Sequence, residues 1–383
     1  MKITHLCLKG TITDGWSYQE NLLIKSHIKL GYAVSVITSQ WVYDENAHLY
    51  KFPKTEYITD QGAQIYRLPI ANKDNLDYKF KRYSNVIETL EKCSPDILFI
   101  HGNQFLDIDK IVKYLKNTRK VKVFVDNHSD FSNSATNWLS KNILHKCLWK
   151  RTAHMIEPYT TKFYGVLPAR VDFLVDMYHL PKNKCELLVM GADDEYVEKY
   201  KSPTTRDKIR KSFGIKKDDF LVVTGGKIDS SKRQTLILME TVKTSPDSRL
   251  KLLVFGSIQD DLKQKVLDMC DGEKIQYLGW ANEDQSYKYF SLADIVVFPG
   301  RHSVYWEQVA GQGIPMVCKY WEGTTHVNIY DNVIFLYEDT VDAISEVFEK
   351  LLKNVDALNN MKEAAQKAMK VFSYDEIAKK SIL

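Results

Sequence analysis

Short apolar runs alternate with longer amphipathic stretches along most of the chain. In the first half, apolar runs predict buried strands at residues 3–8, 33–38, 96–101 and 120–126, and an amphipathic helix is expected at 19–30. The alternation returns with strands expected at 220–224, 250–256, 274–278, 295–298 and 316–318, and helices at 304–312, 340–354 and 355–371. Because strands alternate with helices, the pattern favours parallel sheets built from βαβ units.

Length and composition narrow the class of protein. A chain of 383 residues exceeds what one hydrophobic core usually supports, so two domains are expected. No apolar run approaches the roughly 20 residues of a membrane span, and no signal-peptide pattern precedes the first strand, so we expect a cytoplasmic protein. The six cysteines are scattered, which argues against a disulfide framework and structural zinc. The net charge of +4 is too small to imply nucleic acid.

The stretch 298–323 carries the densest candidate chemistry. A predicted strand ends at Phe298, a loop of small residues follows, and a short helix opens at Val304. Such a helix points its free N–H groups and positive dipole end above the sheet edge, where phosphate commonly binds. The carboxylate of Glu307 could reach both hydroxyls of a ribose from the first turns, or it could simply favour the helix N-terminus.

A second candidate for phosphate binding follows the strand at 220–224. Gly226 comes shortly after this strand, and Lys227 and Lys232 come next. Glycine lets a ligand approach the backbone closely, and lysine is a compact charge that can lie against diphosphate oxygens. A solvated basic loop has the same composition. The sequence lacks the G-x-x-x-x-G-K-[ST] pattern of a P-loop.

Polar residues also follow the strands of the first half. His101 and Asn103 come at the end of one strand, and His128 and Asp130 follow the next. The carboxyl ends of parallel strands form the edge at which open α/β sheets bind ligands. A histidine there can bind substrate or exchange protons near neutral pH, or it can be satisfied by loop backbone. Gly15, in the first strand-to-helix loop, could admit a ligand or provide only flexibility.

A basic segment without acidic residues lies between Asp130 and Glu157. Its cationic and titratable residues, Lys141, His145, Lys146, Lys150 and Arg151, interleave with Trp138, Leu139, Ile143, Leu144, Leu148 and Trp149. This pattern suits a helix on an anionic membrane surface, and it equally suits a helix that packs on the core with a solvated basic face. Residues 138–151 are therefore a candidate for peripheral membrane contact.

Several of these segments together resemble one enzyme family. Residues 307–317, E-Q-V-A-G-Q-G-I-P-M-V, are similar to the E-A-x-A-x-G-x-P-V signature of retaining GT-B glycosyltransferases of the family 4 type. Lys227 and Lys232 match the cations of that family's G-R-x-x-x-x-K loop, and residues 279–281 resemble its G-x-V turn. An earlier glutamate of the family is Pro299 here. The W-E-Q variant with residues 319–323 and His326 resembles bacterial enzymes that assemble capsular and other surface polysaccharides.

The resemblance implies an α/β fold of the GT-B type. In that fold two Rossmann-like, doubly wound domains face a cleft, and a C-terminal helix crosses back to the first domain. Residues 185–194 resemble the strand and N-G-x-D turn that close the first domain. We therefore expect an acceptor-binding domain at 1–196, a nucleotide-sugar-binding domain at 197–371, and the returning helix at 372–383.

The resemblance also implies roles for individual residues. His128 matches the active-site histidine that contacts the donor sugar, and Lys227 and Lys232 would hold the leaving diphosphate. The donor is expected at Gly15, Gly226, Lys227, Lys232, Gly279, Trp280, Arg301, His302, Ser303, Val304 and Glu307. The acceptor candidates are His101, Asn103 and Asp130. Neither a metal nor a cofactor is expected, and the D-x-D at 107–109 is interpreted as a helix N-cap.

The expected function is transfer of a sugar from a nucleotide-diphosphate sugar, most often UDP, to a glycan or lipid-linked acceptor with retention of configuration. Electrostatic stabilisation of the leaving phosphate would drive the reaction. Two alternatives remain open. Pro299 in place of the earlier glutamate would suit a non-catalytic scaffold that binds sugar nucleotides. A sugar-nucleotide epimerase of the same fold would need acid and base carboxylates and no acceptor surface.

Overall fold

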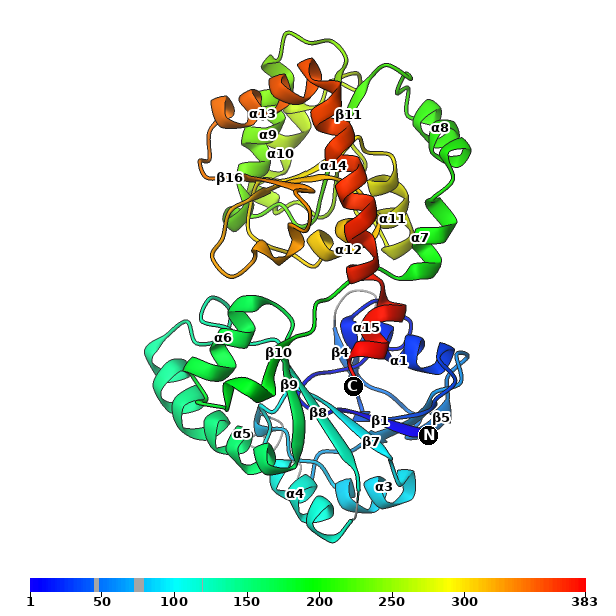
Figure 1. Cartoon of the computed structure of the whole chain (residues 1–383), viewed down its shortest axis with the longest axis vertical. Coiled ribbons are helices and arrows are strands. Elements are labelled where there is room, and N and C mark those ends of the chain that lie inside the picture. Colours follow the sequence, from blue (N-terminus) through cyan, green and yellow to red (C-terminus); the bar gives the residue numbers. More distant parts are fainter. Residues whose placement is uncertain (45–47, 72–78, 119) are drawn as a thin grey trace. The chain divides into compact units, whose positions relative to one another are not determined.

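The chain forms two compact units. The computed structural model describes residues 1–44, 48–71, 79–118 and 120–383. Unit 1 consists of Met1–Val189 together with Ile377–Leu383, and unit 2 consists of Met190–Glu376 (Figure 1). The chain therefore leaves unit 1 once and returns to it with its last seven residues.

Unit 1 is built on an eight-stranded sheet with the strand order β10-β9-β8-β7-β1-β2-β6-β5. Its strands are β1 (Lys2–Cys7), β2 (Ala33–Ser39), β5 (Glu56–Ile58), β6 (Gln64–Leu68), β7 (Ile97–His101), β8 (Lys122–Asn127), β9 (Thr160–Gly165) and β10 (Cys185–Leu187). Neighbouring strands pair in parallel, except that β5 is antiparallel to β6. The short strands β3 (Trp41–Tyr43) and β4 (Leu49–Lys51) form a separate antiparallel pair.

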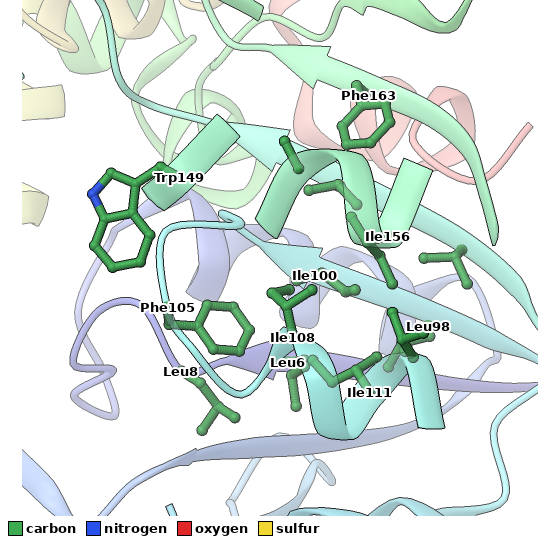
Figure 2. Close-up of a cluster of buried hydrophobic side chains, with 14 of the residues drawn as sticks. Leu6, Leu8, Leu98, Ile100, Phe105, Ile108, Ile111, Trp149, Ile156 and Phe163 are labelled. Carbon is green, nitrogen blue, oxygen red and sulfur yellow. The ribbon is translucent and has the colours of Figure 1, made fainter. Parts of the chain in front are cut away.

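Among the described residues, the helices of unit 1 include α1 (Gln19–Lys29), α3 (Val86–Cys93), α4 (Ile108–Asn117), α5 (Lys150–Ile156) and α6 (Pro168–Asp176). Side chains of β1 and β7, including Leu6 and Ile100, pack with Ile108 and Ile111 of α4 and Ile156 of α5 in one buried cluster (Figure 2). A second cluster unites Ile24 of α1 with Cys7 of β1 and with Val34 and Val36 of β2. Both faces of the sheet are thus covered, which explains why its strands read as continuous apolar runs.

Unit 2 is built on a six-stranded, fully parallel sheet with the order β13-β12-β11-β14-β15-β16. The strands are β11 (Phe220–Gly225), β12 (Leu250–Phe255), β13 (Ile275–Tyr277), β14 (Ile295–Phe298), β15 (Met316–Lys319) and β16 (Val333–Leu336). The helices are α7 (Asp194–Tyr200), α8 (Pro203–Ser212), α9 (Gln234–Thr244), α10 (Asp260–Met269), α11 (Glu283–Ser291), α12 (Tyr305–Gly311), α13 (Val341–Lys353) and α14 (Val355–Ala368). Helix α15 (Tyr374–Lys380) carries the chain from unit 2 back to unit 1.

Both sheets are doubly wound. In unit 1 the first strand, β1, lies between β2 and the later strand β7, and in unit 2 the first strand, β11, lies between β12 and the later strand β14. The strand order therefore reverses beside β1 and beside β11, and ligands of open α/β sheets bind at such points. The expected α/β class with two doubly wound units is confirmed.

The basic segment is helical, as expected. The π-helix η1 (Ser140–Trp149) continues directly into α5. Trp149 and His145 are buried, whereas the exposed fractions of Trp138, Leu139 and Ile143 are 71%, 57% and 46%. One face of the segment therefore packs on unit 1, while apolar side chains remain at the surface. Within the part of the chain that the structure describes, no helix is long and apolar enough to cross a membrane.

Candidate functional sites

A pocket, here called the unit 2 pocket, lies at the carboxyl ends of β11 and β14. Its lining includes five of the residues predicted to bind the donor, namely Gly226, Lys227, Lys232, Arg301 and Ser303. They come from two loops, one after β11 and one after β14, and the end of β12 contributes Val254 and Phe255. The fold thus brings together cations and loop backbone that lie about 70 residues apart in the sequence.

Glycines allow the loops behind this pocket to touch through their backbones. Gly226 and Gly256 have φ angles of +121° and +122°. The Gly226 N–H donates to the Phe255 carbonyl at 3.1 Å, and a Cβ atom at Gly256 would lie only 2.0 Å from the Gly226 carbonyl oxygen. A residue with a side chain cannot occupy position 256 without displacing the loop after β11.

The two lysines of the unit 2 pocket differ in environment. The side chain of Lys227 is 65% exposed, and its Nζ lies 3.5 Å from Asp229 Oδ2. Lys232 is the last residue of a short 3-10 turn and is half-buried; burial lowers its pKa, Asp229 opposes this effect and Lys227 adds to it. No ion pair of Lys232 is found within the described residues. A bound anion would therefore relieve the desolvation of Lys232 and the repulsion between the lysines.

Glu307 lies in the first turn of α12 but is fully buried. Its Oε1 accepts hydrogen bonds from Nε2 of His302 and from Nε2 of His326, each at 2.8 Å. Burial alone would raise its pKa, but the two histidines lower it to about 2. The carboxylate thus holds the loop residue His302 onto α12, and the predicted ribose contact stays a prediction. The three ligand atoms lie within 4.8 Å of one another, close enough to accept a metal ion.

Trp280 follows β13 and has an exposed fraction of 70%, so it is not part of the core. The carbonyl of the preceding Gly279 accepts a hydrogen bond from the Gly256 N–H at 2.8 Å. Gly256 in turn contacts Gly226, so the turn with Trp280 joins the loops of the unit 2 pocket. On the opposite loop, the Arg301 guanidinium lies 5.9 Å from the ring centre of Trp321.

A second pocket, here called the unit 1 pocket, lies at the corresponding edge of the first sheet. It has a volume of about 160 Å³ and is lined by Cys7, Lys9, Gly10, Thr11, Ile12, Glu20, His101 and His128. Two predicted residues, His101 and His128, therefore meet there. Lys9 and Glu20 were not predicted; burial lowers the pKa of Lys9 to about 8, so its ammonium loses a proton unusually easily.

A buried carboxylate joins the two histidines. Asp126 Oδ2 lies 2.7 Å from Nδ1 of His101 and 3.6 Å from Nε2 of His128. Burial would raise the pKa of Asp126, but His101 and then His128 hold it well below its usual range. Asp126 therefore stays ionised between the two rings. The only sequence signal for it was an acidic residue at the end of an apolar strand.

Three other predicted residues lie outside the unit 1 pocket. The Asn103 side chain is fully buried and donates to the Trp149 carbonyl at 3.1 Å. Asp130 accepts hydrogen bonds from the backbone of Ser132 and Asn133 and pairs with Arg170 at 3.1 Å. Gly15 has a φ of +75° in the exposed loop before α1. The acceptor roles of Asn103 and Asp130 and the donor role of Gly15 stay predictions.

Both carboxylates of the D-x-D at 107–109 bind other groups of the protein. Asp107 stands at the N-cap position of α4 as expected, but its side chain makes no capping hydrogen bond to that helix. Instead, Oδ2 accepts from the Tyr83 N–H at 2.6 Å, and Oδ1 lies 3.0 Å from Lys110 Nζ. Asp109 pairs with Arg82 at 3.2 Å. The capping interpretation was right in position and wrong in its hydrogen bond, because Tyr83 N–H takes the carboxylate.

Two doubly wound units, with a C-terminal segment that returns to the first, define the GT-B fold. Solved structures agree: HepE of Anabaena in complex with UDP has a TM-score of 0.68 at 14% identity, covering 99% of this chain and 98% of that one. The UDP-GlcNAc 2-epimerase of Neisseria meningitidis, bound to UDP-GlcNAc, has a TM-score of 0.63 at 12% identity, with coverage of 99% and 98%. These likenesses establish the fold.

The sequence comparison is more specific for unit 2. Residues 205–368 match the family described as glycosyl transferases group 1. A curated relative, an uncharacterized glycosyltransferase of Methanocaldococcus jannaschii, is 23% identical over 216 residues, which are 54% of this chain and 55% of that protein. The match thus spans about half the length of that relative. The family match falls within unit 2, and the residues that line the unit 2 pocket lie within the matched range.

Proposed function

We propose that this protein is a glycosyltransferase that takes its sugar from a nucleotide-diphosphate donor held by unit 2. The observation that carries the proposal is the unit 2 pocket, where Lys232, Lys227 and the loop after β14 meet at the reversal of strand order. UDP is the proposed nucleotide, since similar solved structures contain UDP or UDP-glucose.

In the proposed reaction, the bond between the anomeric carbon and the diphosphate breaks, and an acceptor oxygen bonds to that carbon. Negative charge grows on the leaving diphosphate, which also takes up the proton of the acceptor hydroxyl. Lys227, Lys232 and the N–H groups of residues 301–304 would stabilise that charge. These groups supply the positive charge without a metal ion, and we propose that configuration is retained, as the resemblance implies.

The acceptor is proposed to bind unit 1, at the unit 1 pocket with His128. We further propose a glycan or lipid-linked acceptor in bacterial surface polysaccharide assembly. The exposed Trp138, Leu139 and Ile143 support peripheral contact with an anionic membrane, because exposed basic residues, Lys141 and Lys146, lie among them.

Thermal unfolding in the presence of UDP, GDP, dTDP and ADP and their sugars, with and without magnesium, tests the donor site. A ligand that binds only the folded state raises the melting temperature, and we expect this for UDP without magnesium. Lys232→Ala should abolish the shift and lower transfer about 100-fold or more. Lys243→Ala, on the exposed surface of α9, is the matched control. No shift with any nucleotide would contradict the proposal.

The similarity to UDP-GlcNAc 2-epimerase supports a second candidate, epimerisation of the donor sugar. Incubation with UDP-sugars in the absence of an acceptor separates the two functions. Epimer formation would replace transfer as the proposed function, whereas nucleotide binding without turnover of any kind would favour the non-catalytic scaffold. If transfer is found, the anomeric configuration of the product by NMR tests retention.

A further inference from the structure

Three buried histidines form a continuous series of hydrogen bonds through unit 1, here called the histidine relay: His27, His5 and His101. His27 Nε2 lies 3.1 Å from the Ala378 carbonyl, and His27 Nδ1 lies 3.0 Å from His5 Nε2. His5 Nδ1 lies 2.9 Å from His101 Nε2, and His101 Nδ1 lies 2.7 Å from Asp126 Oδ2. The relay thus runs from the returning C-terminal segment, through the fully buried His27 and His5, to His101 at the unit 1 pocket.

The hydrogen bond between His27 and the Ala378 carbonyl determines which nitrogen of His27 carries a proton. A backbone carbonyl can only accept a hydrogen bond, so His27 Nε2 must carry the proton that it shares with Ala378. Burial lowers the pKa of His27 to about 4, so the ring is neutral near pH 7 and has a single proton. His27 Nδ1 is therefore a bare acceptor.

The second ring repeats this arrangement. Because His27 Nδ1 accepts, His5 Nε2 must donate. Burial, reinforced by His27 and His101, holds the pKa of His5 well below its usual range, so this ring also has one proton. His5 Nδ1 is in turn a bare acceptor, and it faces His101 Nε2.

The third ring, His101, cannot satisfy both of its neighbours with a single proton. His101 Nε2 must donate to His5 Nδ1, while His101 Nδ1 faces Asp126, a carboxylate that only accepts. Both nitrogens of His101 therefore carry a proton, and the ring is positively charged. Burial opposes this charge, but Asp126, with a contribution from Glu20, raises the pKa of His101.

We propose that the histidine relay, anchored by the Ala378 carbonyl, holds His101 as an imidazolium, and that the His101–Asp126 pair positions His128. His101 is then a positioning residue, because both of its N–H groups are already engaged. The ionised Asp126 faces Nε2 of His128 at 3.6 Å, which favours the His128 tautomer with its proton on Nε2 and leaves Nδ1 as an acceptor. The role of His128 rests on the proposed function, whereas the charge of His101 does not.

The charged and titratable groups around His101 come from three other elements of unit 1 and from the loop after β1. His5 faces it from β1, Asp126 and His128 from β8 and its end, and Glu20 from α1. Lys9 lines the same pocket. The carboxylates of Asp126 and Glu20 thus stabilise the positive charge of His101, and the ammonium of Lys9 destabilises it.

One other arrangement of protons fits the same distances. Ser381 Oγ lies 3.1 Å from His27 Nε2 and 2.9 Å from the Ala378 carbonyl. If its hydroxyl donated to His27, the hydrogen bonds from His27 to His5 and from His5 to His101 would both reverse, and His101 would be neutral with its one proton on Nδ1. That state leaves the Ala378 carbonyl facing an unprotonated nitrogen, which is unfavourable. The two states differ in the protonation of three rings, so they can be distinguished directly.

Nitrogen NMR of the histidine rings in the full-length protein, labelled with ¹⁵N-histidine, tests the relay. We expect His5 and His27 to be neutral with the proton on Nε2, and His101 to carry both protons at pH 7. A neutral His101, or a proton on Nδ1 of His5 or His27, would overturn the proposal. Ser381→Ala removes the hydroxyl that contacts His27 Nε2 and could reverse the relay, so its spectrum should equal that of the wild type.

His27→Phe tests the anchor. The change leaves His5 Nε2 without its acceptor, so His5 should move its proton to Nδ1, and the titration midpoint of His101 should fall by at least about one pH unit. His179→Phe, at an exposed histidine of the same unit, should leave the midpoint unchanged. An unchanged midpoint in His27→Phe would show that Asp126 acts alone. If this variant does not fold, the wild-type and Ser381→Ala spectra still decide the proton positions.

Transfer assays separate this inference from the proposed function. If the protein transfers sugar, His27→Phe should shift the pH profile of the rate by the same amount as the His101 midpoint, whereas a purely structural role would lower the rate at every pH. If no transfer is found but the NMR result is as expected, the proposed function fails and the charge of His101 stands.

Discussion

The two units place a pocket at the same topological position and fill it with opposite chemistry. In unit 2 the reversal of strand order is lined by glycine backbone and by two lysines, for which the described residues offer only the partly exposed Asp229, paired with Lys227. In unit 1 the equivalent edge is lined by histidines, and the buried cation of His101 is paired with Asp126 inside the protein. The fold fixes where a ligand can bind, and the residues after the strands decide which kind.

The difference lies in where positive charge is available. Lys232 has no ion pair among the described residues, and Lys227 is largely exposed, so an anion can approach both. His101 donates both of its N–H groups to protein partners, His5 and Asp126. Unit 2 is thus arranged to receive the charge of a ligand, and unit 1 is arranged to hold its own charges in fixed positions.

The largest effect is expected from a glycine of unit 2. In Gly256→Ala the new Cβ would lie 2.0 Å from the Gly226 carbonyl oxygen, so the loop after β11 must move. We expect a loss of about 3 kcal/mol or more in the free energy of unfolding, and loss of nucleotide binding. Chemical denaturation and thermal shifts with UDP measure both.

Gly272→Ala is the matched control for this prediction. Gly272 also has a positive φ, +75°, but a Cβ there would meet open space. We expect only the backbone cost of about 1 kcal/mol and unchanged nucleotide binding. Equal losses in the two variants would show that the contact with Gly226 is unimportant.

Acid should destabilise unit 1 before unit 2. The pKa values of His5 and His27 are lowered in the folded state, so their stabilising contribution is present above about pH 6.5 and is lost as the pH falls. His101 has a raised pKa and acts in the opposite direction: its contribution is present below about pH 6.5 and is lost as the pH rises. Between about pH 6.5 and pH 4 the unfolded chain therefore binds up to about two more protons at these sites, worth up to roughly 3 kcal/mol per pH unit.

The buried carboxylate of unit 2 responds at lower pH. Since the pKa of Glu307 is lowered from 4.5 to about 2, its contribution is present above about pH 4.5 and is lost only as the pH falls towards 2. Pulsed hydrogen exchange with mass spectrometry after incubation at each pH should show unit 1 opening first. Opening of unit 2 at pH 5, with unit 1 still protected, would contradict the assignment of charges in the relay.

The smallest effects are expected from two tryptophans with nearly equal exposed fractions, 71% for Trp138 and 70% for Trp280. Trp138→Ser should weaken binding to vesicles with anionic lipid about tenfold and leave UDP binding unchanged, since it removes apolar area from the basic segment. Trp280→Ser should weaken UDP binding about tenfold through lost stacking and leave vesicle binding unchanged. Vesicle flotation measures binding to lipid, and calorimetry measures binding to UDP. If either variant lost both vesicle binding and UDP binding, the two surfaces would not be separate.

Apolar runs predicted most strands that form the centres of the sheets. Residues 295–298 became β14 with the same bounds, and the other predicted strands shifted by at most two residues. Strand β6 was missed because it contains Arg67, which is 1% exposed and whose charge is satisfied by Asp14 and by carbonyls of Ile12 and Ser39. A buried arginine breaks the apolar pattern, and its partners lie in other segments.

The residues of the candidate sites were likewise predicted where the sequence pattern is local and missed where their contacts join distant segments. Lys227 and Lys232 were found because both stand on one loop after a strand, and the pattern of that loop is local. The histidine relay was missed because its contacts join residues 22, 96 and 351 positions apart. The available signal was weak: His5 lies within an apolar strand run, and His101 ends another. The burial of Glu307 was equally invisible, since it depends on His326, which lies beyond the next strand.

The return of residues 377–383 to unit 1 bears on the order in which the protein is made. A ribosome finishes every strand of the first sheet, and then the whole of unit 2, before it adds the carbonyl that His27 binds. Domains generally fold as they emerge. Nascent unit 1 must therefore wait with its histidines incompletely paired until unit 2 has been synthesised, and the charge pattern of the relay is set only when residues 377–383 have been added.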